Sequence, residues 1–177
     1  MSELKQLLGD YESFVANIDA GLERCGIDRR DLSLMDHICY RVETMERYEE
    51  MKAALAKCAF LLGEAMVTGR LIATFECHEP LEAGEWRIPY IELPQPKEGS
   101  PYPEGLEHVE FVVVGSLDRF ERQYPDLPYD RKGMSKTINP ELGLKYEGIS
   151  VKFHEHQLGA VVRIEDRLEV KGVKYGG

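Results

Sequence analysis

The first 24 residues carry apolar side chains at steps of three and four. These positions are Leu4, Leu7, Leu8, Tyr11, Phe14, Val15, Ile18 and Leu22. Because an α-helix makes one turn every 3.6 residues, this spacing gathers the apolar side chains on one face and predicts an amphipathic helix over residues 2–24. Ser2 is suited to cap its start, and the region of Gly26 ends it. We expect this N-terminal extension, residues 1–33, to pack on the outside of a sheet.

Residues 34–42 (LMDHICYRV) alternate between apolar and polar side chains and predict a strand. Its apolar face carries Ile38, Tyr40 and Val42, and its polar face carries His37, Cys39 and Arg41. A helical segment, ETMERYEEMKAALAKC, follows. Three more strands are expected in FLLGEAMV, RLIATFECHEPL and EWRIPYIELPQP, the last of which is closed by prolines. Residues 34–95 therefore predict a strand, a helix and three strands.

Residues 106–160 repeat this order in a shorter form. LEHVEFVVV is a strand, SLDRFERQY is a short helix capped by Ser116, and RKGMSKTI, ELGLKYEG and ISVKFHEH are three possible strands. Residues 96–105 (PKEGSPYPEG) are rich in Pro and Gly and form either a linker or the lip of a cleft. The pattern assigns no state to residues 157–166. In the C-terminal segment, residues 161–177, the last seven residues are polar and glycine-rich, and we expect them to be loose.

Two matching segments, MDHICYRV and LEHVEFVV, open the two halves, and their histidines lie 71 residues apart. We therefore predict an α+β fold of two duplicated βαβββ units in one compact domain, with a curved mixed sheet, helices outside and the N-terminal helix added. In the second strand Val109, Phe111 and Val113 form the apolar face, and His108 and Glu110 the polar face. These polar faces must meet water, a cleft or a metal ion.

Composition and charge narrow the functional classes. The 177 residues are 43% hydrophobic, which is enough for a core, and they carry 22 Lys and Arg against 32 Asp and Glu, a net charge of -10. So acidic a surface disfavours nucleic acid and anionic lipid as partners. The sequence shows neither an export signal nor an apolar run long enough for a membrane span, so we expect a cytoplasmic protein. Cys25, Cys39, Cys58 and Cys77 form no CxxC pair, which predicts reduced thiols.

The duplicated unit, with a histidine in each opening strand and an acid in the closing strand, resembles the vicinal oxygen chelate superfamily. That superfamily includes glyoxalase I, extradiol dioxygenases and bleomycin-resistance proteins. More closely, DHICYRVET, IELPQPK and GSPYPEGLEHVEFV are similar to the YecM family of bacterial proteins, over about residues 30–160. The resemblance implies a metal-binding protein.

Carried over by position, the resemblance implies His37 and His108 as metal ligands, with Glu92 of YIELP closing the first unit. Two residues compete to close the second. Strand phase favours His154, whereas the habit of the superfamily favours Glu155, and a β-bulge would reverse the choice. Such a site of nitrogen and oxygen donors suits a divalent Zn, Ni, Co, Mn or Fe ion.

Two further residues of the polar faces are candidates for catalysis. Glu110 could orient a ligand or act as a general base, and alternatively it could pair with a lysine. Arg41 could hold an anionic group of a substrate. A histidine in a strand is more often a hydrogen-bonded structural residue than a ligand, but matching position and face in both halves favours ligands.

Three functions are compatible with these residues. The first is a metal-dependent isomerase, lyase or dioxygenase acting on a small oxygenated molecule. The second is a protein that binds or sequesters a small ligand in the same cleft, with Tyr90 and Trp86 as candidate walls. The third is a structural protein with an idle site, which the presence of both histidines and Glu92 disfavours. Because both halves lie in one chain, a monomer is sufficient, and a homodimer stays open.

Overall fold

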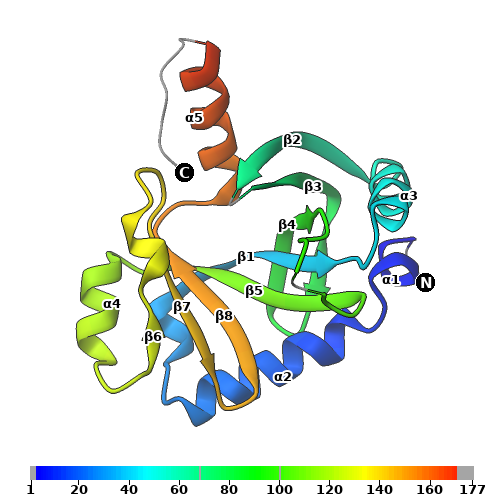
Figure 1. Ribbon diagram of the computed structural model, residues 1–177. Helices are drawn as coiled ribbons and strands as arrows, with labels where there is room; N and C mark the ends of the chain where they lie inside the picture. Colours follow the sequence, from blue (N-terminus) through cyan, green and yellow to red (C-terminus); the bar gives the residue numbers. More distant parts are fainter. Residues whose placement is uncertain (1–2, 68, 100, 171–177) are drawn as a thin grey trace.

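One eight-stranded mixed sheet forms the centre of the computed structural model, which describes residues 3–67, 69–99 and 101–170 (Figure 1). Its strands are β1 (Leu32–Arg41), β2 (Ala59–Val67), β3 (Arg70–Ala83), β4 (Trp86–Pro94), β5 (Gly105–Val113), β6 (Tyr129–Asp130), β7 (Glu141–Tyr146) and β8 (Ile149–His154). Across the sheet their order is β2-β3-β4-β1-β5-β8-β7-β6.

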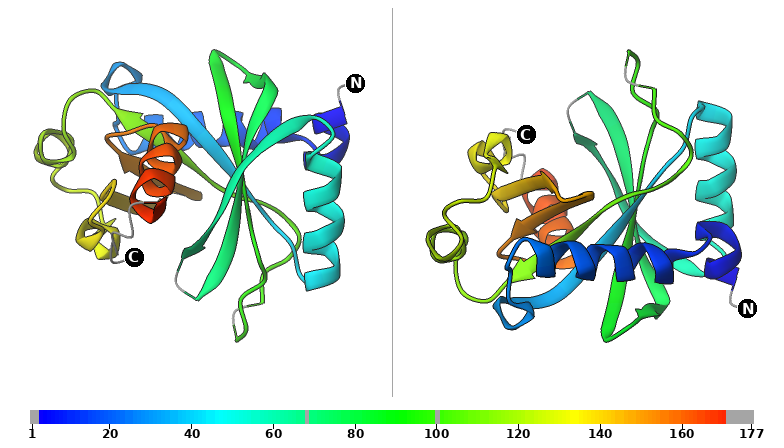
Figure 2. Two further views of the ribbon diagram at one scale, coloured as in Figure 1. Left: turned by 90° about the horizontal axis from the view of Figure 1, so that it is seen from above. Right: turned by 90° about the horizontal axis from the view of Figure 1, so that it is seen from below.

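This strand order confirms the predicted duplication. In the first unit β1 pairs in parallel with β4, and in the second unit β5 pairs in parallel with β8. The units join where β1 and β5 pair antiparallel, so each opening strand lies in the middle of the sheet. One helix follows each opening strand, α3 (Met45–Leu55) in the first unit and α4 (Leu117–Gln123) in the second. The two predicted βαβββ units are therefore present in a strongly curved mixed sheet (Figure 2).

The predicted N-terminal helix is two helices, α1 (Glu3–Leu8) and α2 (Tyr11–Arg24). Gly9, with φ +77°, separates them, and the Asp10 side chain caps α2 by accepting a hydrogen bond from the Ser13 amide at 3.1 Å. Apolar periodicity continues across this break, which is why the pattern alone did not reveal it. The proposed cap Ser2 lies outside the described residues. As predicted, α2 packs across the outside of the sheet (Figure 2).

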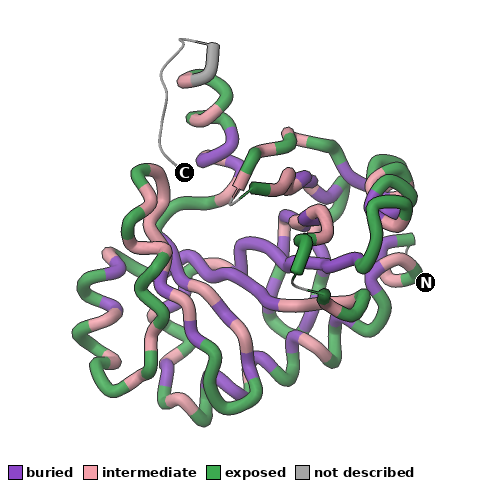
Figure 3. Tube along the Cα trace, in the orientation of Figure 1, coloured by how far each residue is buried: buried purple, intermediate pink, exposed green. Residues whose placement is uncertain are grey.

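The apolar strand faces form the core, as the alternation predicted. Ile38, Val109 and Phe111 are fully buried, and the buried positions follow the central strands in Figure 3. Trp86 also lies in this core: its ring contacts that of Phe111, and its indole N–H donates to Asp19 of α2 at 2.8 Å. Trp86 therefore packs under α2, and its predicted place as a wall of the cleft is wrong.

Two segments of the second unit differ from expectation. RKGMSKTI contains a 3-10 helix, η2 (Lys132–Ser135), in place of a strand, because the Asp130 side chain accepts from the Lys132 amide and turns the chain. Residues 157–166 begin α5 (Leu158–Val170), so part of the predicted C-terminal segment is helical. Residues 171–177, predicted to be loose, lie outside the described residues. No helix among the described residues is long and apolar enough to cross a bilayer.

Candidate metal centre

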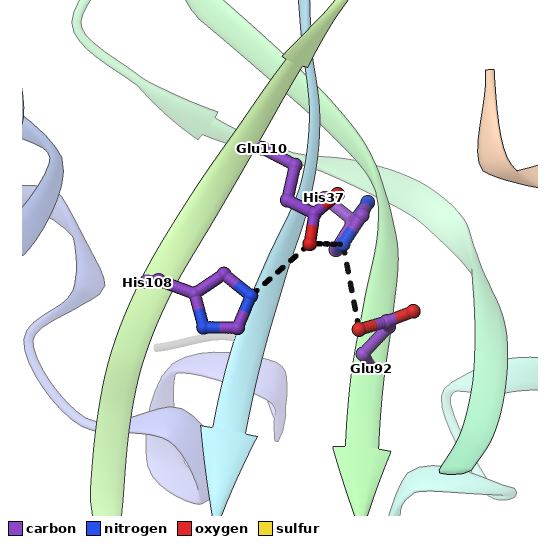
Figure 4. Close-up of side chains that lie close together, drawn as sticks. All are labelled: His37, Glu92, His108 and Glu110. Atoms are coloured by element: carbon purple, nitrogen blue, oxygen red, sulfur yellow. Dashed lines mark hydrogen bonds and ion pairs between the residues drawn. The ribbon is translucent and has the colours of Figure 1, made fainter. Parts of the chain in front are cut away.

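Four side chains from three neighbouring strands converge on the face of the sheet opposite the core (Figure 4). They are His37 from β1, Glu92 from β4, and His108 and Glu110 from β5, and we call them the four-residue cluster. One potential ligand atom of each lies within 4.8 Å of the others. The structure thus brings together the two predicted histidines, the predicted Glu92, and Glu110, which the sequence suggested for another role.

The strand register explains why these residues meet. His37 lies directly opposite Glu110 across the β1–β5 pair. Cys39, two residues after His37, lies between His108 on β5 and Glu92 on β4. The distances are short: His37 Nε2 lies 3.4 Å from Glu110 Oε1 and 3.5 Å from Glu92 Oε2, and His108 Nε2 lies 3.2 Å from Glu110 Oε1.

The acid that precedes each histidine in the sequence fixes the ring of that histidine. Asp36 Oδ2 lies 3.0 Å from His37 Nδ1, and Glu107 Oε2 lies 3.2 Å from His108 Nδ1. A carboxylate that holds Nδ1–H fixes the tautomer and leaves Nε2 as the ligand atom, which is the usual arrangement around a metal-bound histidine. Both Nε2 atoms point into the four-residue cluster.

Two β-bulges make these contacts possible. Strict alternation places a residue and its predecessor on opposite faces of a sheet. The register passes from Met35 opposite Phe111 to His37 opposite Glu110, so Asp36 is an extra residue on β1. It also skips Glu107 between His108 and Leu106 on β5. A bulge re-aims the side chain of the extra residue, and here each acid turns toward its histidine.

The donor set fits a divalent cation. His37 Nε2 is buried, makes no hydrogen bond within the described part of the chain and faces two carboxylates. Two imidazoles and two carboxylates form a mixed nitrogen and oxygen set that suits Zn, Ni, Co, Mn or Fe ions. A divalent cation would add a counter-charge for the buried carboxylates of this group.

Charges in the cluster are strongly coupled. Burial alone lowers the pKa of His37, but the carboxylates of Glu110 and Glu92 outweigh it and raise that pKa well above the ordinary value. Burial alone raises the pKa of Glu110, but the Lys152 ammonium and His37 hold it well below the ordinary value. Glu110 is therefore a carboxylate that is hard to protonate, which suits a ligand better than a general base.

The two candidates for the closing position of the second unit lie in different places. His154 is 1% exposed, and its Nε2 lies 3.5 Å from both Glu110 Oε2 and Asp36 Oδ2. Burial lowers the pKa of His154, against the opposing effect of Glu110 and Asp36. Glu155 points away from the cluster, and its Oε1 accepts a hydrogen bond from the Leu117 amide at 2.8 Å, at the start of α4. The structure brings His154 to the edge of the four-residue cluster and leaves Glu155 outside it.

The sequence allowed a lysine partner for Glu110 without identifying it, and the structure shows that this partner is Lys152. On β4, Glu92 pairs with Cys39, two residues after His37; on β8, Lys152 pairs with Glu110, two residues after His108. Lys152 therefore occupies the position in the second unit that Glu92 occupies in the first. Its Nζ lies 2.7 Å from Glu110 Oε1. Strand alternation places Lys152 on the same face of β8 as His154. Only the pairing of β8 with β5 shows that Lys152 is equivalent to Glu92.

Arg41 lies beside the four-residue cluster but is already paired. Its Nη1 lies 3.0 Å from Glu107 Oε1, and Tyr102 of the Pro- and Gly-rich loop stacks its ring 4.8 Å from the guanidinium carbon. Burial alone raises the pKa of Glu107, but His108 and Arg41 lower it to about 2. Arg41 thus stabilises the carboxylate that orients His108.

The sequence is similar to proteins of one family. A family model described as YecM protein matches residues 3–135, a range that contains the four-residue cluster. Protein YecM of Escherichia coli (strain K12) is 30% identical over 152 residues, which cover 86% of this chain and 74% of that protein. An uncharacterized protein of Haemophilus influenzae is 35% identical over 80 residues, 45% of this chain and 41% of that one.

Solved structures share the fold. A chain titled "Structural Genomics, Protein EC4020" matches with a TM-score of 0.75 and 28% identity, covering 93% of this chain and 94% of that chain. A variant of Streptomyces coelicolor methylmalonyl-CoA epimerase in complex with 2-nitronate-propionyl-CoA matches with a TM-score of 0.54 and 14% identity, covering 72% of this chain and 96% of the epimerase. The epimerase match shows the vicinal oxygen chelate fold and nothing about substrate.

Proposed function

The chain belongs to the YecM family, and we propose that it is a metal-binding protein whose four-residue cluster holds one divalent cation. The observation that supports this most strongly is the paired orientation of the histidines. Asp36 and Glu107 each hold an Nδ1, so that both Nε2 atoms point at the carboxylates of Glu92 and Glu110. A histidine that binds a metal through Nε2 usually has a carboxylate or carbonyl on Nδ1, and both rings have that arrangement.

We further propose that the protein is a metal-dependent enzyme, an isomerase, lyase or dioxygenase, acting on a small oxygenated substrate. A divalent cation held by the four-residue cluster would supply Lewis acidity toward a carbonyl or carboxyl oxygen. The residues of this chain prepare the site, because Asp36 and Glu107 fix the two imidazole rings. Arg41 acts by positioning Glu107, in place of the substrate contact expected from the sequence.

Elemental analysis tests the metal site. We would purify the chain without a histidine tag, load it with Zn, Ni or Co, and remove excess metal. We expect about one equivalent in the wild type and a loss of most of it in His37→Ala and in His108→Ala, because each variant lacks one of the four ligands.

The matched control is His78→Ala, which alters an exposed histidine of β3 whose ring lies against Phe60. This variant should keep the metal content of the wild type. Equal metal content in the wild type and both cluster variants contradicts the proposal.

A further inference from the structure

Lys152 breaks the symmetry of the duplicated site. A repeat that kept its closing acid would place a carboxylate opposite Glu110, as it places Glu92 opposite Cys39. This chain places a cation there. A buried or half-buried lysine beside a metal site opposes metal binding through charge repulsion, so a compensating role is expected for it.

The contacts of Lys152 leave room for a further partner. Its ammonium has two carboxylate neighbours, Glu110 at 2.7 Å and Glu141 at 3.5 Å, whereas an ammonium has three N–H donors. Glu141 is itself shared, because its other oxygen pairs with Lys136 at 2.7 Å. A cation that takes the charge of Glu110 therefore leaves Lys152 with only a shared counter-charge.

Lys152 is also the accessible group of the site. Its side chain is 32% exposed, against 6% for Glu110 and 2% for His37. A ligand that approaches the four-residue cluster from solvent thus meets the ammonium next to the cation. The two positive charges together favour a negatively charged oxygen.

We infer that Lys152 binds an anionic oxygen of the ligand that the protein takes beside its cation, so that the substrate class is a small carboxylate or a related oxyanion. The inference rests on the proposed function, since it places the anion between Lys152 and the cation of the four-residue cluster. On this inference β8, the closing strand of the second unit, contributes to substrate binding and not to metal binding.

Removal of the Lys152 charge should strengthen binding of the cation and weaken binding of the anion, so one variant tests two effects of opposite sign. We would load the wild type, Lys152→Gln and Lys152→Arg with Co(II), and titrate each with oxalate as the anionic probe and imidazole as a neutral metal ligand. In Lys152→Gln we expect tighter Co(II) binding and oxalate binding weaker by at least about tenfold, because a charge-assisted contact is lost. Imidazole binding should stay unchanged, and Lys152→Arg should keep most of the oxalate affinity.

Lys57→Gln is the matched control, because Lys57 is exposed and follows α3, an element that supplies no residue to the four-residue cluster, and it should behave as the wild type. Wild-type oxalate affinity in cobalt-loaded Lys152→Gln overturns the inference and leaves the proposed metal site intact. If Lys152→Gln loses Co(II) as well as oxalate, the inference is also overturned, because loss of a charge that repels the cation should not weaken Co(II) binding. Failure of the wild type to bind Co(II) contradicts the proposed function itself.

Discussion

Asp36 and Glu107, which precede the two histidines, contact the imidazole rings although strand alternation would place them on the opposite face. Asp-His and Glu-His occur at matching points of the two units, and in both the acid contacts the ring that follows it. Asp36 also accepts a hydrogen bond from the Leu158 amide, so it ties the start of α5 to the site. These acids define the direction in which each imidazole can bind.

Changing either acid should weaken metal binding while the ligands themselves remain. For Glu107→Gln and Asp36→Asn we expect a loss of affinity of about 10- to 100-fold, as is typical when the partner of a metal-bound histidine is altered. Isothermal titration with Zn(II) measures it, and thermal unfolding checks that each variant folds. Glu49→Gln, on the exposed side of α3, is the control. If Glu107→Gln binds Zn(II) as tightly as the wild type, the His108 ring does not depend on Glu107 for its orientation.

A variant of Glu155 decides whether Glu155 is the metal ligand that the superfamily pattern suggested for the second unit. Its carboxylate accepts from an amide in the first turn of α4, where a negative charge also interacts well with the helix dipole. Glu155→Ala should therefore lower the free energy of unfolding by about 1 kcal/mol and leave the metal content unchanged. Chemical denaturation and elemental analysis give the two quantities. If the variant loses its metal instead, Glu155 is a ligand after all.

At the scale of the elements, the sequence predicted the strands and helices well where periodicity is strong. β1, β5 and the helices that follow them lie where the apolar periodicity and the predicted cap Ser116 indicate, and the structure adds Thr44 as the cap of α3. The two bulges were not predictable, because an extra residue leaves the pattern of apolar positions almost unchanged and appears only when the partner strand is known. The break at Gly9 and the 3-10 helix of residues 132–135 depend on local side-chain hydrogen bonds in the same way.

The contact between α2 and β8 depends on one glycine. A Cβ at Gly21 would clash with the side chain of Ile149. Gly→Ala in a helix normally stabilises a protein by about 1 kcal/mol, but here we expect Gly21→Ala to destabilise it by about 1–3 kcal/mol through overpacking. Urea denaturation measures the change.

The same substitution in an Ile149→Ala background should cost less, because the clashing methyl group is then absent. A gain of stability from Gly21→Ala in the otherwise wild-type chain would show that α2 does not press closely on β8.

At the scale of the whole molecule, the duplication was visible in the sequence and the asymmetry of the site was not. Two histidines 71 residues apart predicted two units that share one site, and the sheet joins those units along β1 and β5. Lys152 looked like an ordinary strand lysine, because its equivalence to Glu92 follows only from two separate strand pairings. One half of the molecule thus supplies a closing carboxylate, and the other half supplies a closing ammonium.

The location of the cation tests this account most directly. We would crystallise the protein with Co(II) or Zn(II) and collect diffraction data at the absorption edge of the metal. The account predicts one anomalous peak bound by Nε2 of His37 and of His108 at about 2.0–2.1 Å, with Glu92 and Glu110 as oxygen ligands and Lys152 outside the coordination sphere. A peak bound through an Nδ1 atom, or one that lies away from the four-residue cluster, would contradict it.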